Sequence, residues 1–535
     1  MNAGPTVHAA ATTASPSAWA PLRVAAFRAL WLALLASNIG TWMQTVGAQW
    51  LLVEESGTDT MVAVVQTAST LPIVLLAMPA GALADIFDRR RLLIAVQVFL
   101  TAAGALLTAL TVAGQMPPTL LLTLTFVLGA GQALTAPAWQ SIIPDLVPRP
   151  QLASASALGA ISMNLARAVG PAVAGVLIAR AGAGVVFGFN TLSFAVFALV
   201  LWRWHPAPAT GSGTPERFAA AVRSGGRYVR HSPVVRRILL RAGLFLVPGS
   251  ALWALLPLVA SRGLGLGSGG YGILLGAVGA GAVAGALLLP RLRARWSLNQ
   301  LLLISGVLFA VVLAVLGTAG SPAAAVVALL PAGVAWVMVL SSVNAAMQLF
   351  LPNWVRARGL AIYQMVFAGA QAAGALAWGV VSDVWGLFPA HLAAAALMLA
   401  GVVTLRWWPL RDTSGLNRDP AVYWPEPHLE LDPDDHGGPV LVLAAYRVRP
   451  EREAAFVEAM AGVRRSRLRT GAERWGLFHD GERPGRLVEA YVVPSWDEHL
   501  RQHGGRLTGA DRAVEQRALD LADGPPEVSH LLSTH

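Results

Sequence analysis

An aspartate and three arginines frame a short turn after residue 80. The stretch Gly81–Arg91 reads GALADIFDRRR, in which Asp85 precedes Arg89 and Arg90. At a helix end, an ion pair between such groups can form and break as two parts of a protein move, and Gly81 permits close helix approach. We interpret Gly81, Asp85, Arg89 and Arg90 as a gating site. The alternative is that the arginines only fix the orientation of the chain in a membrane.

A second stretch, residues 167–175, combines a cation with a helix-bending pair. It reads RAVGPAVAG, with Gly170 and Pro171 inside an apolar run. A Gly-Pro pair bends a spanning helix and frees a backbone carbonyl. Arg167 is costly within a membrane unless it faces a cavity or a partner. The stretch is therefore either a functional bend or a tight-packing site at Gly170 and Gly175.

Neutral polar and aromatic residues are the other binding candidates. No Asp or Glu lies near the middle of an expected spanning helix, so the sequence offers no obvious proton carrier. Asn and Gln side chains could line a substrate cavity or form hydrogen bonds between helices, and tryptophan could stack on an aromatic ligand. The cavity candidates are Asn38, Gln44, Gln49, Asn164, Asn190, Trp253, Asn344 and Gln364.

Nothing in the sequence predicts catalysis, a cofactor or a metal. The chain has no cysteine, which excludes disulfides and thiolate metal sites. His479, His499 and His503 lack metal-ligand spacing, and the last two share the face of a helix that we interpret as solvated. The alternative is that the C-terminal region modifies a small molecule held by the rest of the chain.

Composition indicates that these residues are carried by membrane helices. Hydrophobic residues make up 55% of the chain and charged residues 13%, against about 25% charged in soluble domains. A spanning helix needs roughly 20 apolar residues. We therefore predict an all-α polytopic protein with twelve transmembrane helices. The apolar runs lie at 29–52, 62–84, 92–113, 118–142, 152–179, 184–203, 238–260, 270–290, 298–318, 322–349, 359–382 and 386–406.

The arginines predict the orientation. With the N-terminus placed inside, the inner loops hold most arginines of the membrane part, and the outer loops hold only Arg180 and Arg262. Positive residues concentrate on the cytoplasmic side, so both termini are expected to be cytoplasmic. The net charge of +10 then reflects membrane topology, and the partner is a lipid bilayer and not a nucleic acid.

Six plus six spans indicate two parallel repeats, each of six helices. Composition divides the chain into six segments, of which the last has strand and helix patterns in the order β-α-β-β-α-β that is typical of a ferredoxin-like domain. The segments are a disordered tail (1–22), a first bundle (23–203), a cytoplasmic linker with a short interfacial helix (204–237), a second bundle (238–411), an acidic, proline-rich linker (412–438) and a cytoplasmic domain (439–535).

The turn after residue 80 resembles the loop motif of the major facilitator superfamily, G-x-L-A-D-R-x-G-R-R-x. Ile86 and Asp88 depart from it. Residues 170–175 resemble the G-P-x-x-G-G motif of exporters in that superfamily, with Ala174-Gly175 in place of the last Gly pair. The resemblance implies a secondary transporter with alternating access in a bacterial inner membrane. For the motif in span 5 it implies export coupled to protons. An importer of the same fold is the alternative.

The C-terminal region resembles the small domains of antibiotic-biosynthesis monooxygenases, through Tyr446, Trp475 and residues 495–503. Such a tail also occurs in enterobactin-exporter-like transmembrane secretion effectors, which the chain resembles at four further places. This family implies export of siderophores, drugs or secondary metabolites. The tail would regulate transport or mediate self-association. The four places are Trp42-Met43-Gln44, Pro137-Ala138-Trp139, Asn164-Leu165-Ala166-Arg167 and Arg358-Gly359-Leu360-Ala361.

Overall fold

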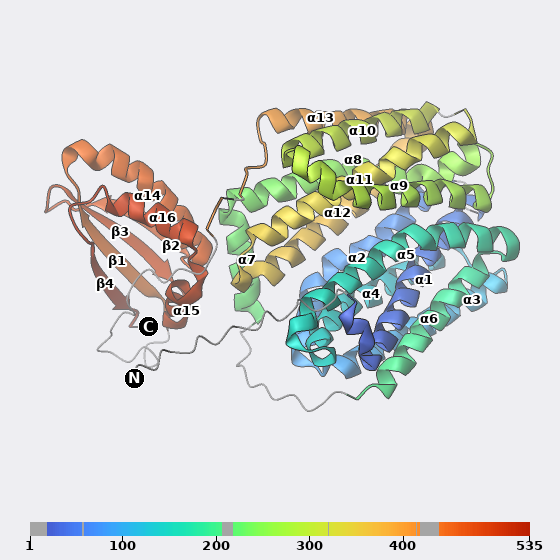
Figure 1. The fold of residues 1–535 in the computed structure, drawn as a ribbon, viewed down its shortest axis with the longest axis horizontal. Helices are drawn as coiled ribbons and strands as arrows, with labels where there is room; N and C mark the ends of the chain where they lie inside the picture. The colour runs from blue at the N-terminus through green and yellow to red at the C-terminus, as the bar shows by residue number, and fades with distance from the viewer. Residues whose placement is uncertain are drawn as a thin grey trace, which may run out of the picture. The chain divides into compact units, whose positions relative to one another are not determined.

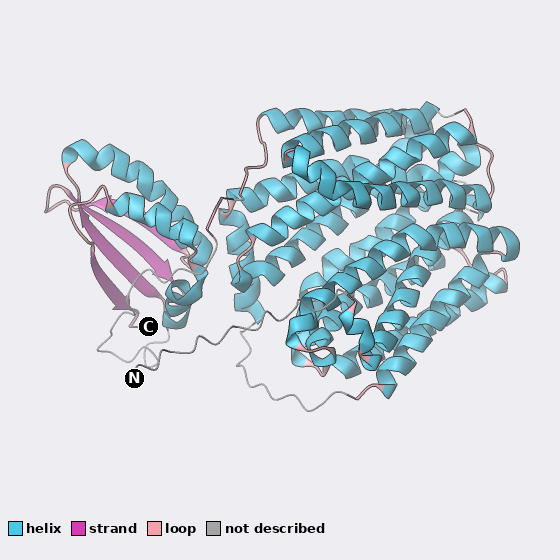
Figure 2. Cartoon of the chain, viewed as in Figure 1, coloured by secondary structure: helices cyan, strands magenta, loops and turns pink. Residues whose placement is uncertain are grey.

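The computed structural model describes residues 19–534, except 56–57, 206–217, 319, 414 and 418–437. The chain is almost entirely helical up to residue 406 and forms a small sheet-containing domain after residue 438 (Figures 1 and 2). The predicted N-terminal tail and the predicted acidic linker lie almost wholly outside the described residues.

Every apolar run of the first half corresponds to one long helix. Neighbouring helices are joined by short connections, and Gly182, with φ of 78°, forms the turn between the fifth and sixth helices. The backbone there is left-handed, which glycine tolerates best. The helices are α1 (Ala25–Glu55), α2 (Asp59–Ile86), α3 (Arg89–Val112), α4 (Pro118–Leu146), α5 (Leu152–Ala181) and α6 (Ala183–Arg203).

The second half repeats this pattern after a short amphipathic helix, α7 (Phe218–His231), which lies where the sequence predicts an interfacial helix. A π-helical turn, Val259–Gly263, extends the first long helix of this half. The long helices are α8 (Pro233–Leu258), α9 (Ser268–Arg295), α10 (Leu298–Thr318), α11 (Pro322–Phe350), α12 (Asn353–Trp385) and α13 (Leu387–Val403).

Eleven helices within the described residues are long and apolar enough to cross a membrane. Helix α1 is not among them, although its 31 residues are sufficient in length. Polar side chains such as Asn38, Gln44 and Gln49 lower its mean hydropathy. The twelfth predicted span, 29–52, therefore stays a prediction.

Two compact units divide the chain, and the division does not follow the two sequence halves. The first unit contains α1–α6 together with Pro257–Ala280, which covers the end of α8 and the beginning of α9. The second contains Ile73–Met78, the rest of the second half and the C-terminal domain. In the first unit α1 packs on α5 and α6, and Gly47 lets α1 approach Phe187 of α6.

The C-terminal domain is a four-stranded antiparallel sheet with two long helices on one face (Figure 2). Its elements follow the predicted β-α-β-β-α-β order, and the strands are ordered β2-β3-β1-β4. The assignment to the ferredoxin-like class stays a prediction. The elements are β1 (Val440–Arg447), α14 (Pro450–Thr470), β2 (Arg474–His479), β3 (Arg486–Val493), α15 (Trp496–Arg501), a π-helical turn (Gln502–Arg506), α16 (Gly509–Leu519) and β4 (Glu527–Leu532).

The two faces of this sheet differ. Tyr446 and Leu487 point under the helices and join a core with Phe456 of α14. On the opposite face, Phe478 is 58% and Leu531 49% exposed. An apolar sheet face of this kind could pair with a second copy, but self-association of the tail stays a prediction.

A buried charge network crosses the core between sheet and helices. Arg467 on α14 is 1% exposed; its Nε donates to Glu489 at 3.2 Å, and it forms an ion pair with Glu515. The Trp475 indole and the Tyr446 hydroxyl also donate to Glu489, at 2.8 and 3.1 Å. The two carboxylates raise the pKa of Arg467 well above its usual range despite its burial. Such a network specifies one packing arrangement, because removing one partner leaves a buried charge unpaired.

The interpretation of His499 and His503 as part of a solvated helix is wrong. His499 is 0% and His503 8% exposed. The His499 ring centroid lies 4.5 Å from that of His503, 4.8 Å from that of His530 and 5.1 Å from that of Trp496. Burial, with a smaller effect of neighbouring cations and histidines, lowers the pKa of His499 to about 2 and that of His503 to about 4. Both rings are therefore neutral at physiological pH.

These two pKa values predict that acid weakens the C-terminal domain. Between pH 6.5 and about 4 the unfolded chain binds protons on both histidines, while the folded domain does not, so the free energy of unfolding falls as the pH drops. The loss is about 1.4 kcal/mol per histidine at pH 5.5. Hydrogen exchange of the β1 and β3 amides, corrected for intrinsic rates, measures it. A H499L/H503L variant should show a shallower pH dependence, and an unchanged slope would contradict the assignment.

Candidate functional site

The predicted gating loop lies at the turn between α2 and α3. Gly81 and Asp85 belong to the last turns of α2; their side chains lie outside the described part of the structure. Arg89 donates to the Ser141 carbonyl of α4 at 3.0 Å and lies 4.0 Å from the Asp145 carboxylate. The structure thus places the first arginine of the motif against α4.

Arg90 caps the C-terminal end of α6. Its Nε and Nη2 donate to the carbonyls of Leu201 and Trp202, at 3.0 and 2.5 Å. These carbonyls belong to the last turn of α6, where no further backbone donor follows. Arg90 therefore satisfies the C-terminal end of α6 from the start of α3, which gives this motif residue a structural role in addition to any role in gating.

The second half uses an asparagine at the corresponding place. Asn299, at the start of α10, donates to the Leu410 carbonyl at 2.8 Å and accepts from the Leu410 amide at 2.8 Å. Leu410 follows α13, the helix that corresponds to α6. In each half, the start of the third helix thus bonds to the backbone at or after the sixth: Arg90 to the last turn of α6, and Asn299 to Leu410, which lies beyond α13.

Helix α5 makes two close approaches at the predicted exporter motif. A Cβ on Gly170 would lie 2.8 Å from the Trp42 Cβ and 3.1 Å from the Ile39 carbonyl of α1. A Cβ on Gly175 would lie 2.9 Å from the Gly272 nitrogen of α9, a residue of the same compact unit. Of the two interpretations left open by the sequence, close packing is directly observed at both glycines.

Pro171 and Arg167 flank the contact of α5 with α1. Pro171 lies within the continuous helix α5. The Arg167 guanidinium lies 5.3 Å from the centroid of the Trp42 ring, a geometry in which the ring face attracts the cation. The two residues that mark the family resemblance in α1 and α5 are therefore in contact.

Four of the predicted cavity residues form hydrogen bonds between helices of the first unit. Asn190 of α6 donates to Gln44 of α1, and both are buried. Gln49 accepts from the Tyr271 hydroxyl at 2.8 Å, beside the stacked rings of Tyr271 and Trp50. In the same way, the Asn38 amide donates to the hydroxyl of Ser162 on α5, at 3.0 Å.

The remaining cavity candidates are placed differently. Trp253 packs edge-to-face on Trp336 at 5.3 Å within an aromatic cluster of the second half. Asn344 accepts from the Gln348 amide at 3.2 Å. Asn164 and Gln364 have exposed side chains. Among the eight candidates, these last two are the most accessible to a ligand.

Two polar contacts have no counterpart in the sequence predictions. Asp59, at the start of α2 and 5% exposed, forms an ion pair with Arg262. Both residues lie at helix ends that the sequence predicts to face the outside. Because the predicted outer loops hold few charges, the presence of one acid and one cation there could have indicated this ion pair. Arg241 is the second case.

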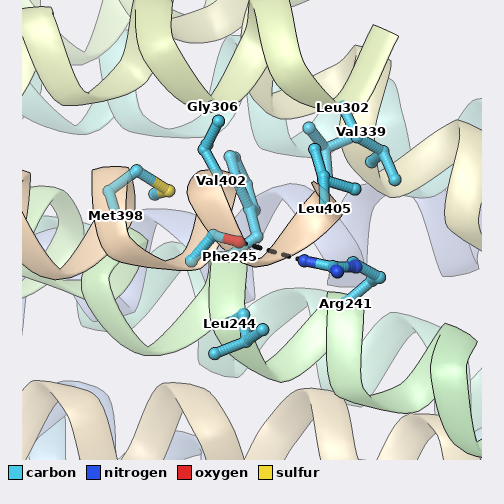
Figure 3. A pocket seen from close by; sticks show the side chains of 10 residues that line it. Arg241, Leu244, Phe245, Leu302, Gly306, Val339, Met398, Val402 and Leu405 are labelled. Atoms are coloured by element: carbon cyan, nitrogen blue, oxygen red, sulfur yellow. Dashed lines mark hydrogen bonds between the residues drawn. The ribbon is translucent and has the colours of Figure 1, made fainter. Parts of the chain in front are cut away.

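Arg241 closes α13 and borders a small apolar pocket (Figure 3). It is 4% exposed and donates to the Gly401, Thr404 and Trp408 carbonyls at 3.0, 2.8 and 2.7 Å, and to the Thr404 hydroxyl at 2.8 Å. The pocket is lined by leucines, Phe245 and Met398, so it offers little to orient a polar ligand.

No group of three His, Cys, Asp or Glu side chains within the described ranges is arranged to hold a metal ion. Among the predicted cavity residues that the structure describes, Asn38, Gln44, Gln49 and Asn190 join helices to one another.

The close contact at Gly175 predicts that one added methyl group lowers the stability of the protein. Gly175→Ala places a Cβ against the Gly272 backbone, so α5 and α9 must separate. We expect a loss of about 1–3 kcal/mol of stability, as for other overpacked sites. Thermal unfolding in detergent measures it. Gly159→Ala, in the same helix with open space around its Cβ, is the matched control. Equal melting temperatures for the two variants would contradict the contact.

Comparison with known proteins adds a family-level result. The profile of the family described as "Transmembrane secretion effector" matches residues 16–535. The staphyloferrin A transporter of Staphylococcus aureus (strain NCTC 8325 / PS 47) is 23% identical over 51% of this chain and 69% of that protein. Macrolide efflux protein A of Streptococcus pyogenes is 23% identical over 44% of this chain. That match spans 58% of the efflux protein, less than two thirds of its length.

A longer match is to the multidrug efflux pump Tap of Mycobacterium tuberculosis (strain CDC 1551 / Oshkosh), 26% identical over 72% of this chain and 94% of Tap. Among solved structures, an auto-inhibited POT family peptide transporter has a TM-score of 0.58 at 14% identity, covering 73% of this chain and 98% of that chain. An inward-facing bacterial homologue of the human lysosomal transporter Spinster has a TM-score of 0.55 at 17% identity, covering 72% and 95%. These likenesses show a transporter fold in the membrane part.

Proposed function

The chain belongs to the transmembrane secretion effector family, and we propose that it exports small amphipathic molecules such as siderophores, drugs or secondary metabolites. The observation that carries this proposal is the family match along residues 16–535, together with relatives named for siderophore transport, macrolide efflux and multidrug efflux. A membrane part rich in neutral polar and aromatic side chains suits such substrates, because binding sites for small molecules are largely apolar with few polar groups.

The energy source in this proposal is the proton gradient, by antiport. Support comes from the exporter motif at Gly170, Pro171 and Gly175, whose close packing holds α5 against α1 and α9. Asp59 is a buried carboxylate at a helix end, paired with Arg262, and ionisable groups in membrane proteins commonly mark proton or ion paths. We place the protein in the plasma membrane of a bacterium with both termini in the cytoplasm, on the distribution of arginines.

Export is tested by mass spectrometry of the medium from cells with and without the protein, each with and without a protonophore. We expect at least one compound that leaves the cell only when the protein is present and the gradient is intact. Because the assay is untargeted, it also identifies the substrate.

Other outcomes of the same assay distinguish the alternatives. A compound that accumulates inside only in cells with the protein would establish import. A chemically altered compound that appears regardless of the gradient would indicate that the C-terminal domain is an enzyme. Export that survives the protonophore would contradict proton coupling while leaving export itself intact.

We also propose that Asp85 gates transport through the loop between α2 and α3. The change Asp85→Asn removes the charge and keeps the shape, so we expect the protein to insert normally and transport to fall at least about tenfold, the effect of about 1.4 kcal/mol on the barrier. Asp88→Asn is the matched control. Asp88 caps α3 by accepting from the Arg91 amide at 2.7 Å, and asparagine caps as well as aspartate does. Full transport by Asp85→Asn would remove the gating role.

A further inference from the structure

Helix α7 lies in the segment that joins the two sequence halves, and one flank of it packs on α12. The Arg358 Nη1 of α12 donates to the Ser224 hydroxyl of α7 at 2.7 Å, and Ser224 is 2% exposed. A Cβ on Gly225 would lie 2.9 Å from the Arg358 Cβ, so the two helices are close at this glycine. Tyr228, 3% exposed, places its ring edge-on to Trp354 at 5.6 Å. The linker helix is thus fixed to the first turns of α12.

The other flank of α7 contacts the C-terminal domain. The Arg227 Nη2 donates to the Glu498 carboxylate of α15 at 2.9 Å, and Arg227 lies 3.7 Å from Glu473. The Arg469 guanidinium of α14 lies 5.7 Å from the Tyr228 ring centroid. Helix α7 and the domain lie in the same compact unit. The domain therefore docks on a helix that belongs to the membrane part of the sequence.

The carboxylate of Glu498 connects the C-terminal domain to helix α7. Arg506 of the domain donates to both Glu498 oxygens, at 2.5 and 3.0 Å, and its guanidinium also lies 4.7 Å from the Trp354 ring of α12. Ser495 caps α15 by accepting from the Glu498 amide at 3.2 Å, which holds the first turn of the helix that carries this carboxylate. Glu498 is therefore shared between Arg506, which belongs to its own domain, and Arg227 of the linker helix.

This interface has the character of a contact that can open. It includes charged hydrogen bonds and cation–π contacts, and polar interfaces between domains of one chain commonly allow relative motion. When it opens, Glu498 keeps its bond to Arg506, so the domain does not lose its own packing. The contacts that are lost are those of the domain with α7 and that of Arg506 with the Trp354 ring of α12.

We propose that the C-terminal domain is a brake that locks the linker helix α7 onto α12 through Glu498. The proposal rests on transport as the function of the membrane part. Alternating access requires helices to change their packing, and a domain that holds α7 and the first turns of α12 together raises the free energy of any state in which they separate. Release of the domain then speeds transport without any change in the substrate path.

The lock is tested first by hydrogen exchange in the full-length protein. Arg227→Ala removes the contact of α7 with Glu498 and should speed exchange of the α7 amides about tenfold, because a charged hydrogen bond is lost. Arg230→Ala is the matched control: it removes the same charge from the same helix at an exposed position and should leave exchange within about twofold of wild type. Unchanged exchange in Arg227→Ala would overturn the docking.

The brake is tested by transport of the compound identified in the export assay. Arg227→Ala should raise the rate a few-fold, deletion after Arg411 should do the same, and Arg227→Lys, which keeps the charge, should lie between that variant and wild type. A lower rate in Arg227→Ala would show that the domain supports transport instead, and an unchanged rate would show docking without regulation; both would overturn the proposal. If the wild-type protein transports no compound, the proposed function is wrong. The hydrogen-exchange experiment still shows, independently, whether the C-terminal domain docks on α7.

Discussion

Helices in a bilayer gain little from apolar contact with one another, because lipid is as apolar as their side chains. The membrane part of this protein therefore depends on close backbone approach, and glycine provides it. Gly175 of α5 lies against Gly272 of α9, and Gly285 of α9 would place a Cβ 2.9 Å from the Cα of Val334 on α11. Each of these two contacts lies within one compact unit, and in each the missing side chain of glycine permits the close approach.

Arginine has a structural role in this architecture, in addition to the role in membrane orientation that the sequence predicts. Arg90 and Arg241 each satisfy carbonyls at the end of a helix, α6 and α13 respectively. Helix ends near a membrane surface need such donors, because the last four carbonyls have no partner within the helix. One positive charge can therefore set the topology of a loop and hold the helix packing beside it.

The C-terminal domain relies on a different principle, the burial of paired charges in a small core. Arg467 joins Glu489 and Glu515 where a domain of this size would ordinarily place apolar side chains. This arrangement contributes specificity more than stability, since three ions must lose their hydration to form it. A second charged group, Glu498, pairs with Arg506 of its own domain and with Arg227 of α7. The same domain thus uses charge in two places, in its core and at its contact with α7.

The sequence by itself determined the number and order of the long helices, the position of α7, and the order of strands and helices in the C-terminal domain. Those features follow from local patterns, namely apolar runs, alternation and turn residues, that need no knowledge of neighbours. Only the tertiary structure decided which polar residues join helices. Gln44, Gln49 and Asn190 were equally good cavity residues in the sequence, and His499 could not be distinguished from a solvated histidine. The reason is that burial and partner choice depend on which helices pack side by side, and in this chain those partners lie 146 residues apart for Gln44 and 222 residues apart for Gln49.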